Sequence, residues 1–251
     1  MNTSLPWQTQ RAIREGMSFS AVVDINGVHN PKTGGFHVVQ DAIDAGHKSI
    51  FVRDGTYPYV DVTGVDDLCI VGESWGAIID GATDADAMEF NTCDRLIVQN
   101  LTVRTTAGGG SAYNGFDLNS CDDGSYHRLN CDASDNRGLY QGACKRNIFV
   151  DCRADSCDDS GFGVDGLGAE EATFIGCRAS NCGTMGFYLS SSVADDTIMV
   201  ACRAVDNGTY GVDIDVSSEN CVIVGNRLTG NSTANSRDLS GTSTLIGNDE
   251  T

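Results

Sequence analysis

Short apolar runs recur along this chain with a period of 21 to 25 residues, and two different phrases keep that period. One is Cys-Arg-Ala or a variant of it, and it begins at Cys131, Cys152, Cys177, Cys202 and Asn226. The other is a glycine followed by an apolar residue, at Gly115, Gly138, Gly161, Gly186 and Gly211. Two phrases with one period indicate a single structural unit copied along the chain. Each unit holds only brief apolar runs, which predicts three short strands per unit, stacked as turns of an all-β solenoid around a continuous core.

A short helix is expected ahead of the repeats. Its apolar residues recur at helical spacing, at Phe36, Val39, Ala42 and Ile43. Gly46 suits the end of such a helix, so we expect the helix over 36–45. It would act as a cap, because the first coil of a solenoid otherwise exposes its core and a row of unpaired backbone groups.

The cap, the period and the stacked positions together resemble the right-handed parallel β-helix proteins of the pectate-lyase-like superfamily, over about residues 36–247. The resemblance implies a right-handed single-stranded parallel β-helix of about eight coils, roughly 35–40 Å long at about 4.8 Å per coil. We therefore assign 35–251 to the β-helix domain. Residues 1–34 are assigned to an N-terminal attachment arm, with a disordered leader as the alternative for its first part.

The charge of the chain restricts its partners. The formal net charge is −19, and so acidic a surface repels phosphate backbones, which argues against nucleic acid as a partner. Aspartate is abundant and only three lysines occur, a composition that resembles proteins of halophilic organisms; the many turns of a solenoid also use Asp. No apolar run approaches the roughly 20 residues of a membrane span, and the start of the chain does not resemble a secretion signal.

Eleven cysteines raise the question of disulfides or metal. No Cys-x-x-Cys pair occurs, and the four histidines are not spaced to complete a zinc site, so we expect no metal and no cofactor. The cysteines follow the repeat, and stacked coils would place inward cysteines slightly too far apart for a bridge. We interpret them as buried thiols that act as small apolar residues, with disulfides as the alternative.

The strand that follows each repeat glycine predicts a row of outward side chains. Alternation places Phe116, Phe162 and Phe187 inside, so that the next residue of each strand faces solvent. The candidate ligand-binding residues of this row are Asp117, Tyr140, Tyr188 and Asp213, with Gly163 between the tyrosines. Aromatic rings stack on pyranose faces and carboxylates accept hydroxyl hydrogen bonds, which suits a sugar chain. A solvated acidic face is the alternative interpretation.

The same strand carries a possible catalytic motif. Tyr113-Asn-Gly-Phe-Asp117-Leu is similar to the Tyr-Gly-Phe-Asp-Pro-His motif of alginate C5-epimerases, although Leu-Asn replaces Pro-His. The resemblance implies that Asp117 and Tyr113 act on a proton beside a uronic carboxylate, and His127 and Arg128 would then supply an imidazole and a cation. Glycoside hydrolysis, by two carboxylates about 5–9 Å apart such as neighbouring aspartates at 122 and 123, is a further possibility.

A second strand of the repeat predicts an interface. If the residues on either side point inward, an outward apolar row is formed by Phe149, Phe174, Met199 and Ile223. Such a row on an acidic rod suits packing between copies of the chain, and a ladder of arginines at Arg153, Arg178, Arg203 and Arg227 lies beside it. A local bulge that turns the aromatic residues inward is the alternative.

These observations favour a structural and receptor-binding spike or fibre component of a virion, with a halophilic host. The expected partners are two further copies in a homotrimer, other virion proteins and a host-surface glycan or glycoprotein. The expected location is the virion, without membrane insertion. The alternative is a carbohydrate-active enzyme, a polysaccharide lyase or epimerase that acts on acidic polysaccharide through the residues of the motif.

Overall fold

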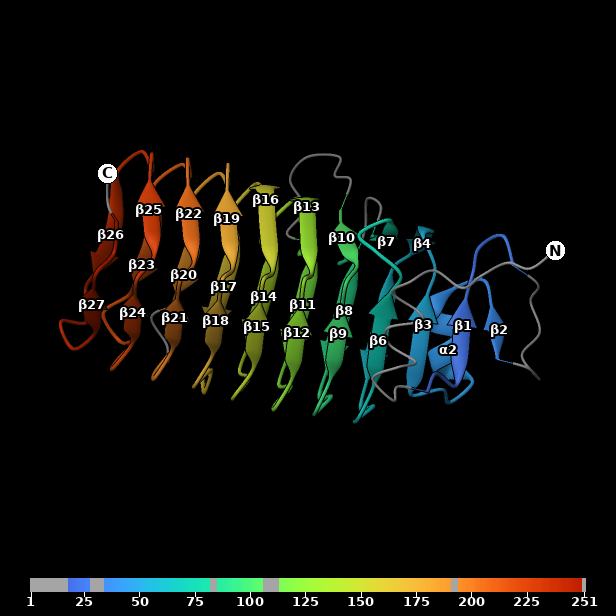
Figure 1. The fold of residues 1–251 in the computed structure, drawn as a ribbon. Coiled ribbons are helices and arrows are strands. Elements are labelled where there is room, and N and C mark those ends of the chain that lie inside the picture. The colour runs from blue at the N-terminus through green and yellow to red at the C-terminus, as the bar shows by residue number, and fades with distance from the viewer. Residues whose placement is uncertain (1–17, 28–33, 82–84, 106–112, 191–193, 250–251) are drawn as a thin grey trace.

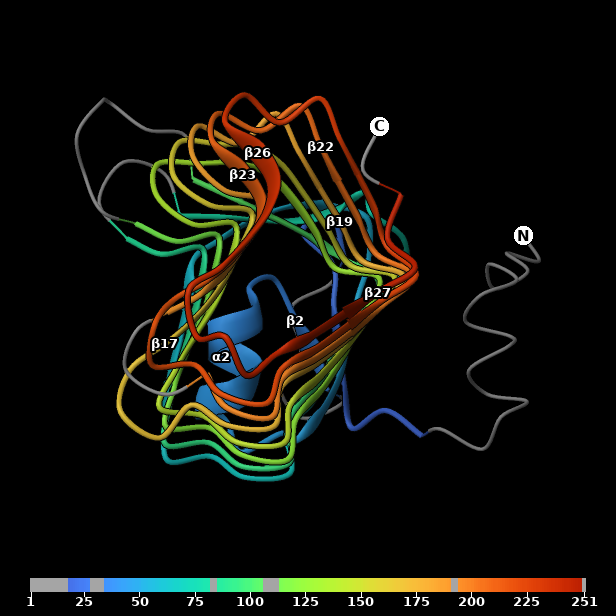
Figure 2. The same cartoon turned by 90° about the vertical axis from the view of Figure 1, so that its left-hand side faces the viewer.

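The structure is a computed structural model that describes residues 18–27, 34–81, 85–105, 113–190 and 194–249. Over these ranges the chain winds into a parallel β-solenoid of about eight coils, most of them with three strands (Figure 1). Seen end-on, the strands stack into separate sheets around a common interior (Figure 2). The predicted fold class is confirmed.

Equivalent strands of successive coils pair in parallel and form three sheets, which we name sheets A, B and C. Sheet A contains, in spatial order, β2 (Gly35–Phe36), β1 (Ala21–Val23), β3 (Ser49–Val52), β6 (Cys69–Gly72), β9 (Ile97–Gln99), β12 (Ser125–His127), β15 (Ile148–Val150), β18 (Thr173–Ile175), β21 (Ile198–Val200), β24 (Val222–Val224) and β27 (Thr244–Ile246). Sheet B contains β4 (Gly55–Pro58), β7 (Ala77–Asp80), β10 (Thr102–Arg104), β13 (Asn130–Ser134), β16 (Arg153–Cys157), β19 (Arg178–Ser180), β22 (Arg203–Val205) and β25 (Arg227–Thr229). Sheet C contains β5 (Val60–Thr63), β8 (Met88–Asn91), β11 (Phe116–Asn119), β14 (Leu139–Gly142), β17 (Phe162–Asp165), β20 (Phe187–Leu189), β23 (Tyr210–Ile214) and β26 (Ala234–Asp238).

The glycine-aromatic phrase has a packing reason in sheet C. Phe162 pairs in register with Phe187, and both side chains are buried in the core. A Cβ atom on Gly186 would lie 2.6 Å from the carbonyl oxygen of Gly211 in the next coil. Because no side chain fits at that distance, glycine is required at this turn in the coils that carry the phrase.

The cysteines are free thiols, as the sequence predicted. All eleven lack a disulfide, and ten of them are buried. Several donate weak hydrogen bonds to backbone carbonyls of the preceding coil; Cys177 Sγ lies 3.4 Å from the Phe149 oxygen, and Cys202 Sγ lies 3.5 Å from the Phe174 oxygen. They therefore serve as small core residues that also bind neighbouring coils together.

The expected capping helix is present as α2 (Val39–Asp44), which buries Val39, Ala42 and Ile43 at the N-terminal end of the solenoid. It contacts β1, β2, β3 and β5, and the end-on view shows it across the opening of the first coils (Figure 2). Strand β1 lies between β2 and β3 in sheet A. Sheet A therefore extends into the segment assigned to the arm, of which residues 1–17 and 28–33 lie outside the described part of the chain.

The prediction that Phe149, Phe174, Met199 and Ile223 form an outward row is wrong. Their side chains are buried, and Phe149 and Phe174 stack with ring centroids 5.1 Å apart. The reason lies in the two residues that separate a sheet A strand from the following sheet B strand, in every coil from β9 and β10 to β24 and β25. The first of the two has a positive φ, for example 52° at Asp151, and this left-handed bend shifts the alternation of side chains by one position. The alternative interpretation, with the aromatic residues inside, is the observed one.

Candidate functional site

The outer face of sheet C carries the row of side chains that the sequence predicted. Strand pairing places in register Glu89, Asp117, Tyr140, Gly163, Tyr188, Asp213 and Arg237. All four candidate ligand-binding residues belong to this row. The burial and the hydrogen-bond partners of these four residues differ.

The centre of the row is a stack of two tyrosines and an arginine. The guanidinium carbon of Arg137 lies 4.8 Å from the ring centroid of Tyr140 and 5.5 Å from that of Tyr188. Its Nε and Nη1 atoms lie 3.3 and 3.4 Å from carboxylate oxygens of Asp159 and Asp165. Cation–π contacts and ion pairs therefore hold Arg137 between two half-buried rings.

Sequence reasoning missed Arg137, although a signal was present. Gly163 occupies the row between Tyr140 and Tyr188, and a Cβ atom there would lie 3.0 Å from Cδ of Arg137. The missing side chain thus makes room for the arginine, which enters from the turn before β14. The gap between the tyrosines is filled rather than open.

Asp117 is held from both sides and is only 6% exposed. Its two carboxylate oxygens accept hydrogen bonds from Asn114 Nδ2 at 2.6 Å and Asn119 Nδ2 at 2.7 Å. Burial raises the pKa of Asp117 to about 6, and the charge of Glu89 adds to the rise, while the two amides and Arg137 oppose it. This carboxyl group therefore titrates near neutral pH.

A second carboxyl group near Asp117 behaves similarly. Burial raises the pKa of Asp86 to about 7, and the negative charge of Asp117 contributes to this rise. The Asp86 carboxylate accepts a hydrogen bond from the backbone N–H of Asn114, whose side chain binds Asp117. The two acids thus form one coupled unit through Asn114.

The sequence predicted that Asp213 faces solvent and can bind a ligand, but the structure shows it buried. Its side chain is fully buried and its two oxygens accept hydrogen bonds from Nε and Nη2 of Arg237, the first at 2.6 Å. The same guanidinium group lies 4.4 Å from the ring centroid of Tyr210. Arg237, whose side chain is partly exposed, thus covers Asp213 at this end of the row.

The four candidate catalytic residues do not form one cluster. Tyr113 and Asp117 lie before and within β11 of sheet C, whereas His127 lies on β12 of sheet A and contacts Ser125 Oγ at 2.7 Å. Arg128 follows at the turn from sheet A to sheet B, where its guanidinium carbon is 5.9 Å from the ring centroid of Trp75. The intervening turn separates the outer faces of β11 and β12, so that imidazole and cation are directed to other sides of the solenoid.

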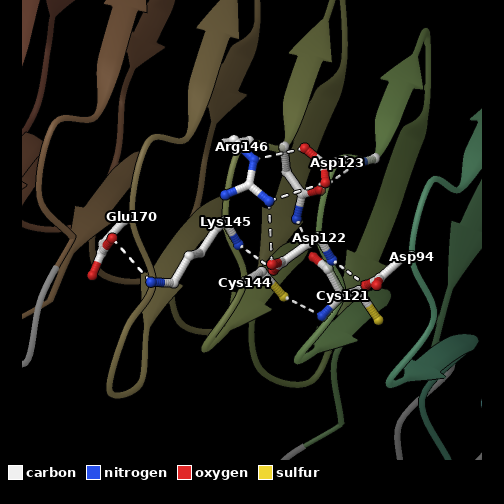
Figure 3. Close-up of polar contacts among 10 residues, drawn as sticks. Asp94, Cys121, Asp122, Asp123, Cys144, Lys145, Arg146 and Glu170 are labelled. Carbon is white, nitrogen blue, oxygen red and sulfur yellow. Dashed lines mark hydrogen bonds and ion pairs between the residues drawn. The ribbon is translucent and has the colours of Figure 1, made fainter.

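The neighbouring aspartates at the corner between sheets C and A are engaged in ion pairs (Figure 3). Arg146 Nε lies 2.7 Å from Asp123 Oδ1, and its Nη2 lies 3.5 Å from Asp122 Oδ2. The other oxygen of Asp122 accepts the backbone N–H of Lys145 at 2.8 Å. These contacts link adjacent coils and assign the two carboxylates a structural role.

Over the part of the chain that the structure describes, no group of three or more His, Cys, Asp or Glu side chains is placed to hold a metal ion. Within the same residues, no helix is long and apolar enough to cross a membrane.

A parallel solenoid with a capped end and outward-facing rows defines the class of β-helix proteins. The sequence over residues 89–249 matches the family described as the right-handed β-helix region, and because this is more than half of the chain, the protein belongs to that family. No curated protein sequence matches the chain significantly.

Solved structures with this fold include enzymes and a viral protein. A double mutant of the periplasmic alginate epimerase AlgG superposes with a TM-score of 0.65 at 13% identity, over 80% of this chain and 50% of that one. The pectin methylesterase from Aspergillus niger gives 0.61 at 13% identity, over 92% and 87%. ORF18 of Geobacillus virus E2 gives 0.53 at 15% identity, over 96% and 61%. The chain thus spans half of the epimerase, and at these identities the similarity shows the shared fold alone.

Proposed function

We propose that the protein is a structural and receptor-binding spike or fibre component of a virus particle with a halophilic host, and that sheet C binds a glycan of the host surface. The observation that carries this proposal is the stack of Tyr140, Arg137 and Tyr188. It presents planar groups in a row along the solenoid axis, as a sugar chain requires. Ion pairs already fix Arg137, so little side-chain freedom is lost when a ligand binds.

The contacts of the row favour binding over chemistry. Proton abstraction needs a base within reach of the substrate and an acid opposite it. Both oxygens of Asp117 already accept amide hydrogen bonds, and the imidazole of His127 belongs to another sheet. ORF18 of Geobacillus virus E2 shares this fold over 96% of this chain, so the fold is one that a viral protein uses.

Self-association into a homotrimer is part of the proposal. The alternation of sheet A leaves apolar side chains on its outer face: Ile148, Ile175, Ile198, Val200 and Val222 are each 36–42% exposed. They lie in two rows on neighbouring strands of an otherwise acidic protein. Exposed apolar side chains gathered on one face in this way suit contact between copies of the chain.

Glycan binding by sheet C is tested with substitutions of matched chemistry. Host-surface glycans are presented in high salt to the wild-type chain and to the Tyr140→Ala, Tyr188→Ala and Tyr59→Ala variants. Tyr59 is 52% exposed outside the row and serves as the control. The two row variants should lose more than about 1 kcal/mol of binding free energy, roughly fivefold in affinity, and the control should not. Equal binding by all four proteins would show that the glycan does not bind to sheet C.

A polysaccharide lyase or epimerase is the second candidate, and the raised pKa values of Asp117 and Asp86 favour it, because such shifts gather at catalytic sites. The test is incubation with acidic and neutral polysaccharides, followed by measurement of polymer size and uronic-acid composition. A change that disappears in the Asp117→Asn variant would establish the enzyme. An unchanged polymer would leave the binding function in place.

A further inference from the structure

The arginines of the described residues fall into two groups. Six form ion pairs with aspartates: Arg53, Arg95, Arg104, Arg137, Arg146 and Arg237. The other five form no ion pair with a described carboxylate: Arg128, Arg153, Arg178, Arg203 and Arg227. In a chain with a net charge of −19, partners for an arginine are plentiful. It is therefore notable that the five unpaired guanidinium groups all belong to sheet B or to the turn that leads into it.

Four of these arginines stand above one another. Arg153, Arg178, Arg203 and Arg227 begin β16, β19, β22 and β25, pair in register and are exposed. These strands are neighbours in the C-terminal half of the solenoid (Figure 1). Like charges directly opposite each other on adjacent strands are destabilising. The fold alone therefore gives no reason for this arginine ladder.

A tryptophan stands at the N-terminal end of the arginine ladder. Trp75 lies in the loop between β6 and β7. The guanidinium carbon of Arg153 lies 4.4 Å from the centroid of the Trp75 ring. The indole Nε1–H donates to the carbonyl of Arg128 at 2.6 Å, and the Trp75 carbonyl accepts from Thr102 Oγ1 at 2.8 Å. Contacts with three later coils thus fix a partly exposed indole over the outer face of sheet B.

The tryptophan and the first two arginines border an open groove of about 350 Å³. Asn130 and Ser180 add polar groups to its wall, and the carboxylates of Asp132 and Asp155 line it as well. Asp155 is engaged locally, since its carboxylate accepts hydrogen bonds from Ser180 Oγ at 2.6 Å and from Asn181 Nδ2 at 3.0 Å. Arg153 also lies against the Trp75 ring and the charge of Arg178 acts on Asp155, but neither guanidinium group forms an ion pair with a described carboxylate, so their N–H donors can bind a ligand.

We propose that the arginine ladder and Trp75 bind an acidic polysaccharide whose chain runs along the solenoid axis. A guanidinium group binds a carboxylate through two parallel hydrogen bonds, and an indole offers a face to a sugar ring. The arginines repeat at the strand spacing of about 4.8 Å, which is close to the length of one pyranose unit in an extended chain. Carboxylates on successive or alternate sugars would therefore meet the ladder in register. This site lies on a different sheet from the Tyr140–Arg137–Tyr188 stack and does not depend on it.

The acidic surface of the protein is compatible with this ligand. A polyuronate carries one charge per sugar, so the rest of the surface repels it less than it repels a nucleic acid backbone. At molar salt the Debye length is about 3 Å, which screens long-range repulsion but leaves direct contacts largely intact. Binding at the ladder should therefore rest on local hydrogen-bonded pairs.

The test uses polygalacturonate as the acidic probe and dextran as the neutral one, with the full chain and calorimetric measurement of affinity over a series of salt concentrations. The double variant Arg178→Gln/Arg203→Gln should bind polygalacturonate at least about tenfold more weakly, because two charge-assisted contacts are lost. It should also show a shallower dependence of affinity on salt, since fewer counterions are released. The matched control is Arg95→Gln/Arg146→Gln, which removes the same charge from ion pairs at the corner between sheets C and A.

Trp75→Leu separates stacking from charge: it should weaken binding while leaving the salt dependence unchanged. Three results would overturn the proposal: no binding of polygalacturonate by the folded wild-type chain, equal loss in the ladder and control variants, or a ladder variant that changes the oligomeric mass and not polymer binding. The last result would assign the ladder to an interface between copies. Tyr188→Ala should bind polygalacturonate as the wild type does, so failure of the sheet C proposal is recognised separately.

Discussion

The rings of Phe162 and Phe187 lie parallel, with their centroids 4.6 Å apart and an interplanar angle of 4°. Phe174 from sheet A meets both rings edge-on, at 5.6 and 5.7 Å. The aromatic core is therefore continuous from coil to coil and from sheet to sheet. Each coil gains much of its stability from its neighbours, as in other solenoids.

Truncation of one ring should disrupt this stack strongly. We expect Phe187→Ala to lower the free energy of unfolding by about 3–5 kcal/mol, because it removes a buried ring and leaves a cavity between two others. Phe187→Leu, which keeps most of the volume, should cost less. Urea denaturation followed by circular dichroism measures both, and equal losses for Ala and Leu would contradict the role of packing volume.

The stacked asparagines should contribute through hydrogen bonds. Asn207 is buried; its Oδ1 accepts the backbone N–H of Cys182 at 3.1 Å, and its Nδ2 donates to Asn231 Oδ1 at 2.9 Å. Asn207→Ala leaves the Cys182 donor unsatisfied and should cost about 1–3 kcal/mol. Denaturant midpoints measure the loss, and a variant as stable as wild type would show that water replaces the amide.

Stability should fall as the pH rises from about 4 to 7. The pKa of Asp117 is raised to about 6 and that of Asp86 to about 7, so the folded protein holds these protons more tightly than the unfolded chain, whose Asp pKa is about 3.9. Their contribution is therefore complete below pH 4 and is lost as the pH passes 6 to 7. In Asp117→Asn the decline in the free energy of unfolding between pH 4.5 and 7.5 should be shallower, by about 1–3 kcal/mol.

An aspartate with the opposite shift provides the control. The Arg146 side chain holds the pKa of Asp123 below its usual value, so its contribution is present above pH 4 and is lost on acidification. Asp123→Asn should therefore leave the decline between pH 4.5 and 7.5 unchanged. A decline that is equally steep in Asp117→Asn and in the wild type would place the titrating group elsewhere.

The thiols should be protected from modification in the folded protein. Burial raises the pKa of Cys177 and of Cys202, and only the thiolate reacts rapidly. Cys69, the one cysteine that is not fully buried, should be alkylated first, and all eleven should react together in urea. Mass spectrometry after timed exposure to iodoacetamide gives the order, and early labelling of Cys177 or Cys202 would contradict a closed core.

The outer face of sheet A should determine the oligomeric state. We expect Ile175→Glu/Ile198→Glu to convert a trimer in high salt to monomers, because charges replace apolar contacts between copies. Leu167→Glu, at an 80% exposed position in the turn after β17, should leave the trimer intact. Light scattering measures the mass, and a wild-type chain that runs as a monomer would remove the trimer from the proposed function.

The sequence was sufficient for the fold because each signal came from a local rule repeated many times. The period, the cap at Val39–Asp44 and the inward positions of sheet C all follow from alternation and spacing. The orientation of Phe149 could not be predicted in this way, because it depends on the left-handed φ of Asp151. The sequence does not show whether such a bend shifts the alternation of inward and outward side chains. A row of aromatic residues has the same spacing along the sequence whether the side chains point outward or inward.

The candidate site was predictable only in part. The row containing Asp117 and Tyr188 follows from strand pairing, but the position of Arg137 over Gly163 depends on the path of a long side chain. The separation of His127 from Asp117 depends on the turn between two sheets. Trp75 contacts Arg128 and Arg153, far along the sequence, and no local pattern indicates that contact.

The in-register pairing of the Cys-Arg-Ala strands has a consequence for how this protein can vary in length. Since Arg178, Arg203 and their equivalents occupy the same position in each coil, removal or duplication of one whole repeat leaves every remaining row aligned. The rod then changes by one strand spacing, about 4.8 Å, while surface pattern and core are retained. Gain or loss of a single residue within the two-residue bend between sheets A and B would not be neutral, because it would exchange the buried and exposed faces of a strand. Whole coils are therefore the units in which such a chain can lengthen or shorten.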